Sequence, residues 1–368
     1  MDGRPRTNLV RSVSGAHVTL ATASSRTLAI GDVRLEAPVV QAALAGYSDR
    51  AMRVVARRHG AAYSLGEVLL DQFVTAVGTN RRNLARLAVA DDEHPVGGQL
   101  MGANPDDFPP AARRLVAEGY DVIDINFGCP VKKVLGRCRG GFLLSQPQTA
   151  LEIVEKVRAA VPPQVPVTLK MRRGLDDSPQ SADNFWMILD GAFARGVAAI
   201  TVHGRTVQQK YVGPSDWDFL AAVKRHAGSR TVLGSGDLFS AEACVAMLQR
   251  TGVDGVSVAR GAIGNPWIFA QTRALLAGQP PLDWPTIHEQ REALREHWRL
   301  AVELHGEDLA GRTMRKFAIK YARVHPEFMA VRDAFIGAKV NADWQAVLDR
   351  FYSADGAGRD PAADIDET

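Results

Sequence analysis

A cysteine stands between a glycine and a proline in the stretch DINFGCPVKKVLGRCRGG. Glycine lets a ligand approach the backbone closely, and proline stiffens the turn around Cys129. An unperturbed thiol has a pKa of about 8.5, so at neutral pH it is mostly protonated and can act as a general acid. The stretch therefore indicates a positioned proton donor beside a basic loop. The alternative is that Cys129 is a small core residue.

Other polar residues follow the apolar runs of the chain, one run after another. They are Gln99, Asn126, Lys170, Arg172, His203, Arg205, Ser235, Asp237 and Arg260. In a parallel barrel the carboxyl ends of the strands meet at one face, so these side chains would converge on one pocket. The last two loops, GSGDL and ARGAIG, contain glycines whose neighbouring N–H groups can approach an anion. The guanidinium of Arg260 can donate two parallel hydrogen bonds to phosphate oxygens. The alternative is that these two loops are tight turns in which glycine is needed only for the backbone conformation.

The elements that must position these residues are short apolar runs alternating with helical patterns. Eight runs occur: APVVQAALA, AAYSLGEVLL, PVGGQLM, YDVIDINF, VPVTLKM, VAAITVH, RTVLGSG and VDGVSVA. This alternation predicts an α/β fold, a (β/α)8 TIM barrel over residues 30–278, with a doubly wound open sheet as the alternative. Residues 279–353 show only helical patterns and predict a small all-helical domain. We expect residues 1–29 to be a flexible extension and the tail 354–368 to be disordered.

Composition narrows the class of protein. The chain has 368 residues, 46% of them hydrophobic and 23% charged, and a net charge of +3 that does not by itself argue for nucleic-acid binding. Cys129, Cys138 and Cys244 are too few for a disulfide framework and lack the spacing of a zinc site, so no metal is expected. No run of about eighteen apolar residues occurs, so neither membrane spanning nor export is expected. We expect a cytoplasmic, monomeric protein.

Five motifs resemble, in order and spacing, those of the tRNA-dihydrouridine synthases, nearest to the bacterial B-type branch. They are DINFGCPVKKV, VTLKMRRG, TVHGRTVQQKYVGPSDW, GSGDL and GVSVARGAIGNPWIF, and the similarity covers about residues 30 to 350. The resemblance implies an FMN-binding barrel followed by a helical domain that binds tRNA. It also implies an oxidoreductase in which NADPH or NADH reduces the flavin, which then saturates the C5–C6 bond of a uridine in tRNA. In the reverse direction NAD(P)+ would accept the electrons.

The resemblance also assigns roles to individual residues. Cys129 would be the catalytic acid, and Asn126 and Arg205 would lie near the substrate base. The flavin would contact Gln99, Lys170, His203 and the backbone of Ala43, Leu44 and Ala45, where the family's usual APMAG reads AALAG. The flavin phosphate would lie along Ser235, Gly236, Asp237, Ala259 and Arg260. Cys138 would be structural, and Cys244, on an apolar helix face, would be core.

A basic stripe in the helical region is a separate indication of RNA. Between Leu309 and Pro326 there is no acidic residue, whereas basic residues recur at steps of three and four. They are Arg312, Arg315, Lys316, Lys320 and Arg323. Cations on one helix face without interleaved acids repel one another unless an anion such as RNA lies on them, although an ordinary solvated face is the alternative. Tyr321 and His325 are candidate stacking groups.

Two other functions remain open on these residues. One is an FMN barrel dehydrogenase acting on a small pyrimidine, which would have no need of the basic stripe. The other is a non-catalytic RNA-binding protein that retains only the barrel shell. Bound flavin would distinguish either enzyme from the non-catalytic RNA-binding protein. Retention of tRNA would distinguish a tRNA-dihydrouridine synthase from a small-pyrimidine dehydrogenase.

Overall fold

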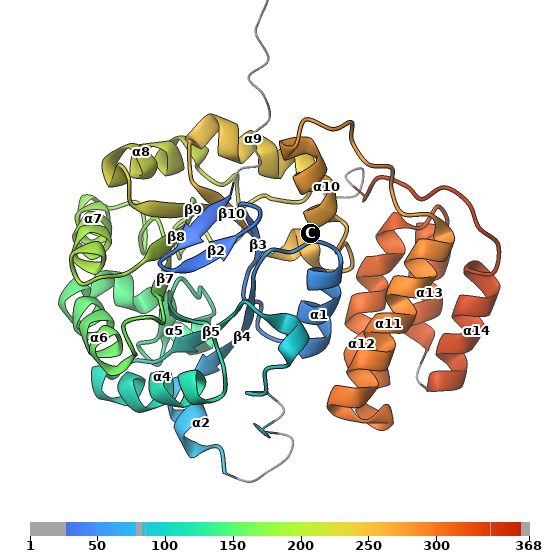
Figure 1. Ribbon diagram of the computed structural model, residues 1–368, viewed down its shortest axis with the longest axis horizontal. Coiled ribbons are helices and arrows are strands. Elements are labelled where there is room, and N and C mark those ends of the chain that lie inside the picture. Colours follow the sequence, from blue (N-terminus) through green and yellow to red (C-terminus); the bar gives the residue numbers. More distant parts are fainter. Residues whose placement is uncertain (1–26, 79–82, 85, 339, 362–368) are drawn as a thin grey trace, which may run out of the picture.

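Eight parallel strands close into a barrel at the centre of the molecule (Figure 1). The computed structural model describes residues 27–361 except 79–82, 85 and 339. Each predicted apolar run contains one strand, and the strands follow one another around the barrel until β10 pairs with β3, which confirms the predicted (β/α)8 fold. The strands are β3 (Val39–Gln41), β4 (Ser64–Leu70), β5 (Val96–Met101), β6 (Val122–Phe127), β7 (Val167–Arg172), β8 (Ala199–His203), β9 (Thr231–Ser235) and β10 (Gly255–Val258).

A helix follows each strand and packs its apolar face on the outside of the barrel. Local signals bound these helices: Ser240 Oγ accepts a hydrogen bond from Ala243 N at 3.2 Å where α9 begins, and Gly252, with φ 72°, ends it. The helices are α1 (Arg50–Arg58), α2 (Asp71–Ala76), α4 (Phe108–Ala117), α6 (Pro147–Ala160), α7 (Pro179–Ala194), α8 (Trp217–Ala227), α9 (Ala241–Thr251) and α10 (Ile268–Leu276).

Short helical segments lie in the loops between these elements. The α5 turn (Lys132–Leu135) follows Cys129 directly, and η4 (Arg260–Ala262) follows β10 at the same end of the barrel. The other 3-10 segments are η1 (Asp91–Glu93), η2 (Pro105–Asp107), η3 (Gly140–Ser145) and η5 (Ala322–Val324).

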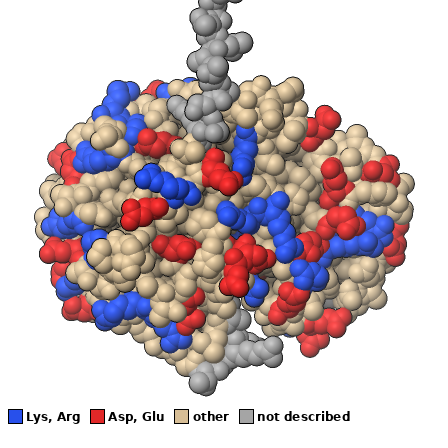
Figure 2. Space-filling model, viewed as in Figure 1, with Lys and Arg blue, Asp and Glu red and all other residues tan. Residues whose placement is uncertain are grey.

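An antiparallel hairpin, β1 (Leu28–Ile30) with β2 (Val33–Leu35), covers the amino ends of the strands (Figure 1). Thr231 at the start of β9 donates from Oγ1 to the carbonyl oxygen of Ala29 at 3.3 Å. The prediction of a flexible extension up to residue 29 is therefore wrong for residues 28 and 29, and residues 1–26 lie outside the described part. Lys, Arg, Asp and Glu are interspersed on this face (Figure 2), which is opposite the carboxyl ends of the strands.

Four helices follow the barrel, with α11 and α12 beside α1 (Figure 1). They are α11 (Ile287–His305), α12 (Glu307–Tyr321), α13 (Phe328–Gly337) and α14 (Asn341–Phe351). Polar and aromatic contacts join them to the barrel. His305 Nε2 lies 3.0 Å from Asp49 Oδ2 at the start of α1, and the rings of Tyr321 and Trp267 meet edge to face with centroids 6.0 Å apart.

The segment after α14 folds back onto the helices. Asp355 Oδ1 accepts a hydrogen bond from His288 N at 3.0 Å, and the carbonyl of Gly356 accepts one from Ile287 N at 2.9 Å. Arg359 N donates to the carbonyl of Val324 at 2.9 Å. The predicted disorder is therefore wrong for these residues, and 362–368 lie outside the described part. None of the helices in the described ranges has the length and apolar character needed to cross a membrane.

Candidate active site

The strand register places the predicted residues in adjacent positions at one end of the barrel. Asn126 on β6 is aligned with Lys170 on β7, and His203 on β8 is aligned with both Arg172 on β7 and Ser235 on β9. The arrangement follows from parallel pairing, because carboxyl-terminal residues of neighbouring strands then share one edge. The polar residues that were read separately from the sequence thus line one site.

A chain of buried hydrogen bonds lies at the floor of this site. Gln99 donates from Nε2 to Asp124 Oδ2 at 2.6 Å and accepts at Oε1 from Asn126 Nδ2 at 2.7 Å. Thr168 Oγ1 donates to the other carboxylate oxygen of Asp124 at 2.5 Å. The sequence analysis gave no role to Asp124, although an acidic residue inside an apolar strand was the signal that could have identified it. This chain fixes the orientation of the Gln99 and Asn126 amides.

Asn126 holds the loop that carries the cysteine. Its Oδ1 accepts hydrogen bonds from Gly128 N at 2.9 Å and Cys129 N at 3.1 Å. Because Nδ2 is bonded to Gln99, both ends of the amide are engaged within the protein. The structure therefore gives Asn126 a positioning role, in addition to the predicted contact with the substrate base.

Cys129 is half-buried, and its thiol is favoured over the thiolate. Burial raises the pKa of Cys129, while the backbone N–H of Val131 and the charge of Arg172 act in the opposite direction. A thiol whose pKa is raised carries its proton at neutral pH, as a proton donor must. Of the other two cysteines, Cys244 is buried as predicted, and Cys138, expected to be structural, is exposed.

Arg172, predicted only as one of the polar residues at the strand ends, has a positioning role that the sequence did not indicate. Its Nε donates to the carbonyl of Gly128 at 3.0 Å, and its Nη1 donates to the carbonyls of Thr206 at 2.9 Å and Lys210 at 2.7 Å. Burial and neighbouring cations lower the pKa of Arg172 to about 10, so it stays charged at neutral pH. The guanidinium thus ties the Cys129 loop to the loop after β8. Its place two residues after Lys170 in VTLKMRRG was the available signal.

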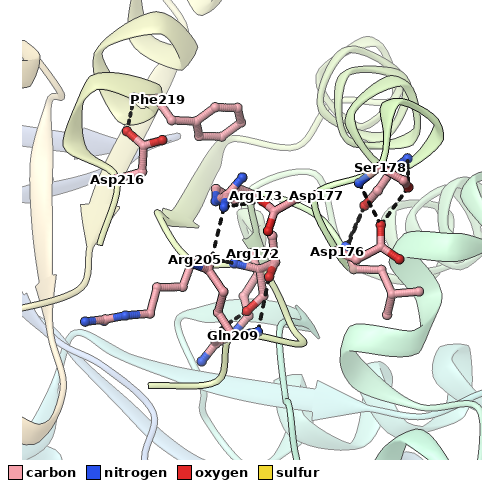
Figure 3. A network of polar contacts seen from close by, with 12 residues as sticks. Arg172, Arg173, Asp176, Asp177, Ser178, Arg205, Gln209, Asp216 and Phe219 are labelled. Atoms are coloured by element: carbon pink, nitrogen blue, oxygen red, sulfur yellow. Dashed lines mark hydrogen bonds and ion pairs between the residues drawn. The ribbon is translucent and has the colours of Figure 1, made fainter. Parts of the chain in front are cut away.

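A second set of hydrogen bonds joins the loops after β7 and β8 (Figure 3). Arg173 Nη2 donates to Gln209 Oε1 at 3.0 Å and also contacts Asp177. The same Gln209 oxygen accepts from Thr206 N at 2.8 Å. Since Thr206 also accepts from Arg172, this network supports the clamp beside Cys129.

His203 is neutral and presents an N–H group. Its Nδ1 lies 3.1 Å from Arg205 N, and because a backbone N–H can only donate, Nδ1 must accept and the proton must reside on Nε2. Burial and the charges of Lys170, Arg172, Arg205 and Arg260 lower the pKa of His203 to about 2. Imidazole in this position can donate a hydrogen bond to a ligand without titrating near neutrality.

Lys170 adds a half-buried positive charge. Burial and the charge of Arg172 lower the pKa of Lys170 to about 8, against a smaller opposing effect of Asp124. Within the described residues, its ammonium group makes no hydrogen bond or ion pair. A half-buried cation in a positive environment is stabilised by an anionic or electron-rich ligand, so Lys170 and His203 could together hold one.

Arg205 and Asp237 lie together, but in a contact that the sequence did not predict. Arg205 Nη2 lies 2.7 and 2.8 Å from the two carboxylate oxygens of Asp237, and its Nε donates to the carbonyl of Gly213 at 2.7 Å. Asp237 Oδ2 also accepts from Ser215 N at 2.7 Å. The pair joins the loops after β8 and β9. Among the described residues, Arg205 Nη1 is buried without a hydrogen-bond partner, so the implied contact with a substrate base would depend on that atom.

The two glycine loops are closely packed, as anion-binding loops require. A Cβ at Gly236 (φ 114°) would lie 2.4 Å from Ser215 Oγ, and one at Gly261 would lie 2.0 Å from the carbonyl oxygen of Leu238. Arg260 stacks on the ring of Tyr211, with its guanidinium carbon 4.5 Å from the centroid. Ser235 ends β9, and Ala259 and Arg260 directly follow β10, so the pairing of these two strands brings the two parts of the predicted cradle to neighbouring positions.

The loop after β3 forms another wall of the site. Ala43 and Leu44 are half-buried and Ala45 is exposed. Ser48 Oγ accepts from Leu44 N at 2.8 Å and so closes the turn, which leaves the backbone of Ala45 at the surface. The carbonyl of Leu44 also accepts from Tyr47 N at 2.9 Å and Ser48 N at 3.0 Å, so both backbone polar groups of Leu44 are used within the turn. The predicted backbone hydrogen bonds to a cofactor would therefore depend on Ala43 and Ala45.

The basic stripe is less uniform than the sequence predicted. Arg312 is exposed, but Arg315 donates from Nε and Nη2 to the carbonyl of Ala338 at 3.2 and 3.0 Å. Lys316 contacts the carbonyl of Gly46 in the barrel and lies over the Tyr47 ring. The predicted RNA contact of Lys316 therefore competes with a contact between barrel and helices. Arg323 lies beyond α12, in η5, so the five cations do not share one helix face.

Two predicted stacking groups are buried instead. Tyr321 is 2% exposed and packs against Trp267, and His325 is 1% exposed with its Nε2 2.9 Å from the carbonyl oxygen of Phe351. Neither ring can reach a base, because both belong to the core of the helical part. No group of His, Cys, Asp and Glu residues that could hold a metal ion is found within the described ranges.

Comparison with known proteins identifies the family. Residues 40–351 match the dihydrouridine synthase (Dus) family. The chain belongs to the dihydrouridine synthase family. It is 35% identical over 333 residues to a probable tRNA-dihydrouridine synthase of Mycobacterium tuberculosis, covering 89% of this chain and 85% of that protein. It is 33% identical over 339 residues to probable tRNA-dihydrouridine synthase 1 of Synechocystis sp., covering 92% of each.

The barrel is also similar to a solved structure of a distant enzyme. Histamine dehydrogenase from Rhizobium sp. 4-9 superimposes with a TM-score of 0.55 at 13% sequence identity, covering 75% of this chain and 51% of that one. This likeness concerns the fold alone. The match of residues 40–351 to the family confirms the resemblance that the five motifs indicated.

Proposed function

We infer that this dihydrouridine synthase is a flavin-dependent oxidoreductase that reduces the C5–C6 bond of uridine in tRNA. The observation that carries the inference is the group of buried and half-buried cations around neutral His203, with the Cys129 thiol at the same end of the barrel. A site that holds an electron-rich ring and a proton donor side by side suits hydride transfer followed by protonation.

The residues of the site fit FMN as the cofactor. Lys170 and His203 Nε2 would face the electron-rich edge of the flavin ring, since each is a donor without a recorded protein acceptor. Gln99 would orient the ring from β5, and the backbone of Ala43, Leu44 and Ala45 would lie along it. The loops from Ser235 to Asp237 and from Ala259 to Arg260 would hold the phosphate through N–H groups and the Arg260 guanidinium.

Bound reduced FMN would be the source of hydride for C6 of uracil. The protein supplies the proton: Cys129 Sγ–H would donate to C5 as negative charge develops there and on O4. Asn126 and Arg172 hold the thiol in place through the peptide group that joins Gly128 to Cys129: its N–H donates to Asn126 and its carbonyl accepts from Arg172. The thiolate that remains would recover its proton from solvent. Because burial favours the protonated form of Cys129, this return is thermodynamically favourable.

The remaining parts of the proposal concern partners. A nicotinamide dinucleotide, NADPH or NADH, would reduce the flavin. The helical domain of residues 279–353 would bind the body of the tRNA while a flipped uridine enters the barrel. Arg312 is the exposed member of the predicted stripe that best suits such a contact. We propose that the protein acts as a monomer in the cytoplasm.

The decisive experiment is to measure dihydrouridine directly. The flavin-loaded protein is incubated with NADPH or NADH and with tRNA transcribed without modifications. The tRNA is then digested to nucleosides, which are separated and identified by mass spectrometry. Formation of dihydrouridine supports the proposal. Flavin that is reduced and reoxidised with free uracil or orotate, and not with tRNA, would instead support the small-pyrimidine dehydrogenase. Protein that cannot be loaded with FMN at all would contradict both enzyme assignments.

A further inference from the structure

The chain that returns to the site after α5 packs directly against Cys129. Gly141 N donates to the carbonyl oxygen of Cys129 at 3.1 Å. A Cβ at Gly140 (φ 58°) would lie 2.8 Å from Cys129 Cβ and 3.1 Å from Met101 Sδ on β5. We call residues 139–141 the closing segment. Because so little space separates this segment from Cys129, whatever holds the segment also holds the thiol.

Arg139 ties the closing segment to the start of α2. Its Nη2 donates to Gln72 Oε1 at 3.1 Å. Gln72 Nε2 donates to Asp107 Oδ2 at 3.0 Å, and since a carboxylate can only accept, the Gln72 amide is oriented with its oxygen toward Arg139. The Nε of Arg139 is buried and has no hydrogen-bond partner among the described residues. One donor of the guanidinium is therefore left over.

The burial of Arg139 separates it from the other basic residues of the same loop. Arg139 is half-buried, whereas Lys132, Lys133 and Arg137 are exposed. A solvated basic loop accounts for the three exposed cations. It does not account for a guanidinium that is partly withdrawn from water toward α2.

Asp71, the first residue of α2, offers the complementary acceptor. It is 1% exposed, and its Oδ1 accepts from Gln72 N at 2.7 Å, whereas its Oδ2 is buried without a partner among the described residues. Burial raises the pKa of Asp71, and the positive charge of Arg139 acts in the opposite direction. A buried carboxylate oxygen without a donor is costly, so the neighbouring cation stabilises it.

The barrel fixes the position of Asp71. This residue directly follows β4, whose last residue, Leu70, is aligned with Met101 on β5. A Cβ at Gly102 would lie 1.7 Å from Asp71 Oδ2, so the carboxylate fits there only because residue 102 is a glycine. The end of β5 thus lies against the Asp71 carboxylate and, through Met101, against Gly140 of the closing segment.

We propose that Asp71 and Arg139 form an electrostatic anchor for the closing segment and are positioning residues for the Cys129 thiol. In the described part of the chain they form no direct ion pair, so their attraction acts at longer range, while Gln72 supplies the hydrogen bond. Asn126 and Arg172 hold the peptide before the thiol, and the anchor holds the chain that returns to it. The proposal rests on the proposed function, which assigns this thiol as the acid.

The first test measures how fast iodoacetamide alkylates Cys129 in the flavin-loaded protein. Peptides are separated by mass spectrometry, so that Cys138 is counted apart. The variants are Asp71→Asn, Arg139→Gln and the two together. Arg137→Gln is the matched control, because it removes the same charge from an exposed position in the same loop. Asp71→Asn keeps the volume of the side chain, so it tests the anchor even if Arg139→Gln disturbs the loop.

Charge and position predict different results in this test. If the two side chains acted on the thiol only through their charges, Asp71→Asn would speed alkylation and Arg139→Gln would slow it, because an anion disfavours the reactive thiolate and a cation favours it. Release of the closing segment should instead speed alkylation in both variants. The double variant should react no faster than the single ones, because the two residues act as one unit.

The second test measures the reaction with saturating tRNA. Arg139→Gln should lower kcat for dihydrouridine formation, by up to about 100-fold if the thiol moves by about 1 Å. Reduction of bound flavin by NADPH should stay near that of the unmodified protein. Arg139→Lys keeps the charge and should recover part of the loss. Arg137→Gln should leave kcat near the unmodified value.

Several results would overturn the proposal. Opposite changes of the alkylation rate in the two single variants would show that the charges act on the thiol without positioning it. Unchanged rates in both, or an equal effect of Arg137→Gln, would also exclude the anchor. Fully additive effects in the double variant would show that Asp71 and Arg139 act separately. If alkylation responds as expected but the unmodified protein forms no dihydrouridine, the proposed function fails while the anchor stands.

Discussion

The guanidinium of Arg172 donates from Nε to the carbonyl oxygen of Gly128 at 3.0 Å, immediately before the cysteine proposed as the acid. The same side chain is bonded to Thr206 and Lys210, so it joins two loops that approach each other only in the folded barrel. The thiol of Cys129 is therefore positioned from a neighbouring strand as well as by its own turn. The position of the Cys129 loop therefore depends on Arg172, which lies outside that loop on β7.

Replacing Arg172 should slow reduction of tRNA more than it affects the flavin. Arg172→Met removes three hydrogen bonds around the Cys129 loop, and misplacement of a reacting group by about 1 Å can cost on the order of 100-fold in rate. We expect kcat for dihydrouridine formation to fall by this order while reduction of bound flavin by NADPH stays near that of the unmodified protein. Single-turnover measurements of the two half-reactions test this, and equal losses in both would contradict the clamp.

Replacing Cys129 should separate the two half-reactions completely. Cys129→Ala keeps the flavin site but removes the proton donor, and general acid catalysis is worth about 100- to 10,000-fold. Dihydrouridine formation should fall within this range, with flavin reduction unchanged. Cys138→Ala is the matched control, since that thiol is exposed and lies outside the proposed chemistry. A Cys129→Ala protein that forms dihydrouridine at the unmodified rate would exclude the thiol as the acid.

The half-buried Lys170 should make flavin binding depend on pH. Its pKa is lowered to about 8 without ligand, so between pH 8 and the unfolded value of about 10.5 the folded protein binds fewer protons than the unfolded chain. Stability without flavin should therefore rise with pH through this range. An electron-rich ligand favours the charged form, so the increase in Tm caused by FMN should be larger at pH 7 than at pH 9.

The variant Lys170→Met tests the origin of that dependence. It should weaken FMN binding and remove the difference between pH 7 and pH 9, whereas Lys156→Met, at an exposed ion pair on α6, should retain it. No inflection from His203 is expected near pH 6.5, because its pKa is about 2. Persistence of the pH dependence in Lys170→Met would show that another group is responsible.

The ion pair between Arg205 and Asp237 should contribute to stability as well as to the site. Arg205→Ala leaves the partly exposed Asp237 carboxylate without its cation and removes the bond to Gly213, and leaving a hydrogen-bonded group without its partner costs about 1–3 kcal/mol. Urea unfolding of the flavin-free protein measures this change. Arg295→Ala, in an exposed pair with Glu292, should change the free energy of unfolding by less than about 1 kcal/mol. Similar effects of the two substitutions would show that the Arg205 pair is not structural.

Some features of the site could not be read from the sequence because their partners are distant along the chain. Arg205 and Asp237 are 32 residues apart, and Lys316 and Gly46 are 270 residues apart. Helical spacing alone grouped Arg315 and Lys316 with an RNA-binding stripe, but Arg315 bonds to Ala338 and Lys316 to the barrel. The segment around Gly356 was missed because a short polar stretch carries weak periodicity. The β1–β2 hairpin did carry a local signal, since its two short apolar runs are joined by the Gly31-Asp32 turn.

The sequence by itself determined the order of strands and helices and the place of the polar residues at the strand ends. Apolar periodicity and turn residues are local properties, and parallel pairing then brings Asn126, Lys170 and His203 to one edge. Only the tertiary structure decided how these groups interact: that His203 is neutral with its proton on Nε2, and that Arg172 clamps the cysteine loop. The physical reason is that burial and charge depend on which loops meet in space, and spacing along the chain does not contain that information.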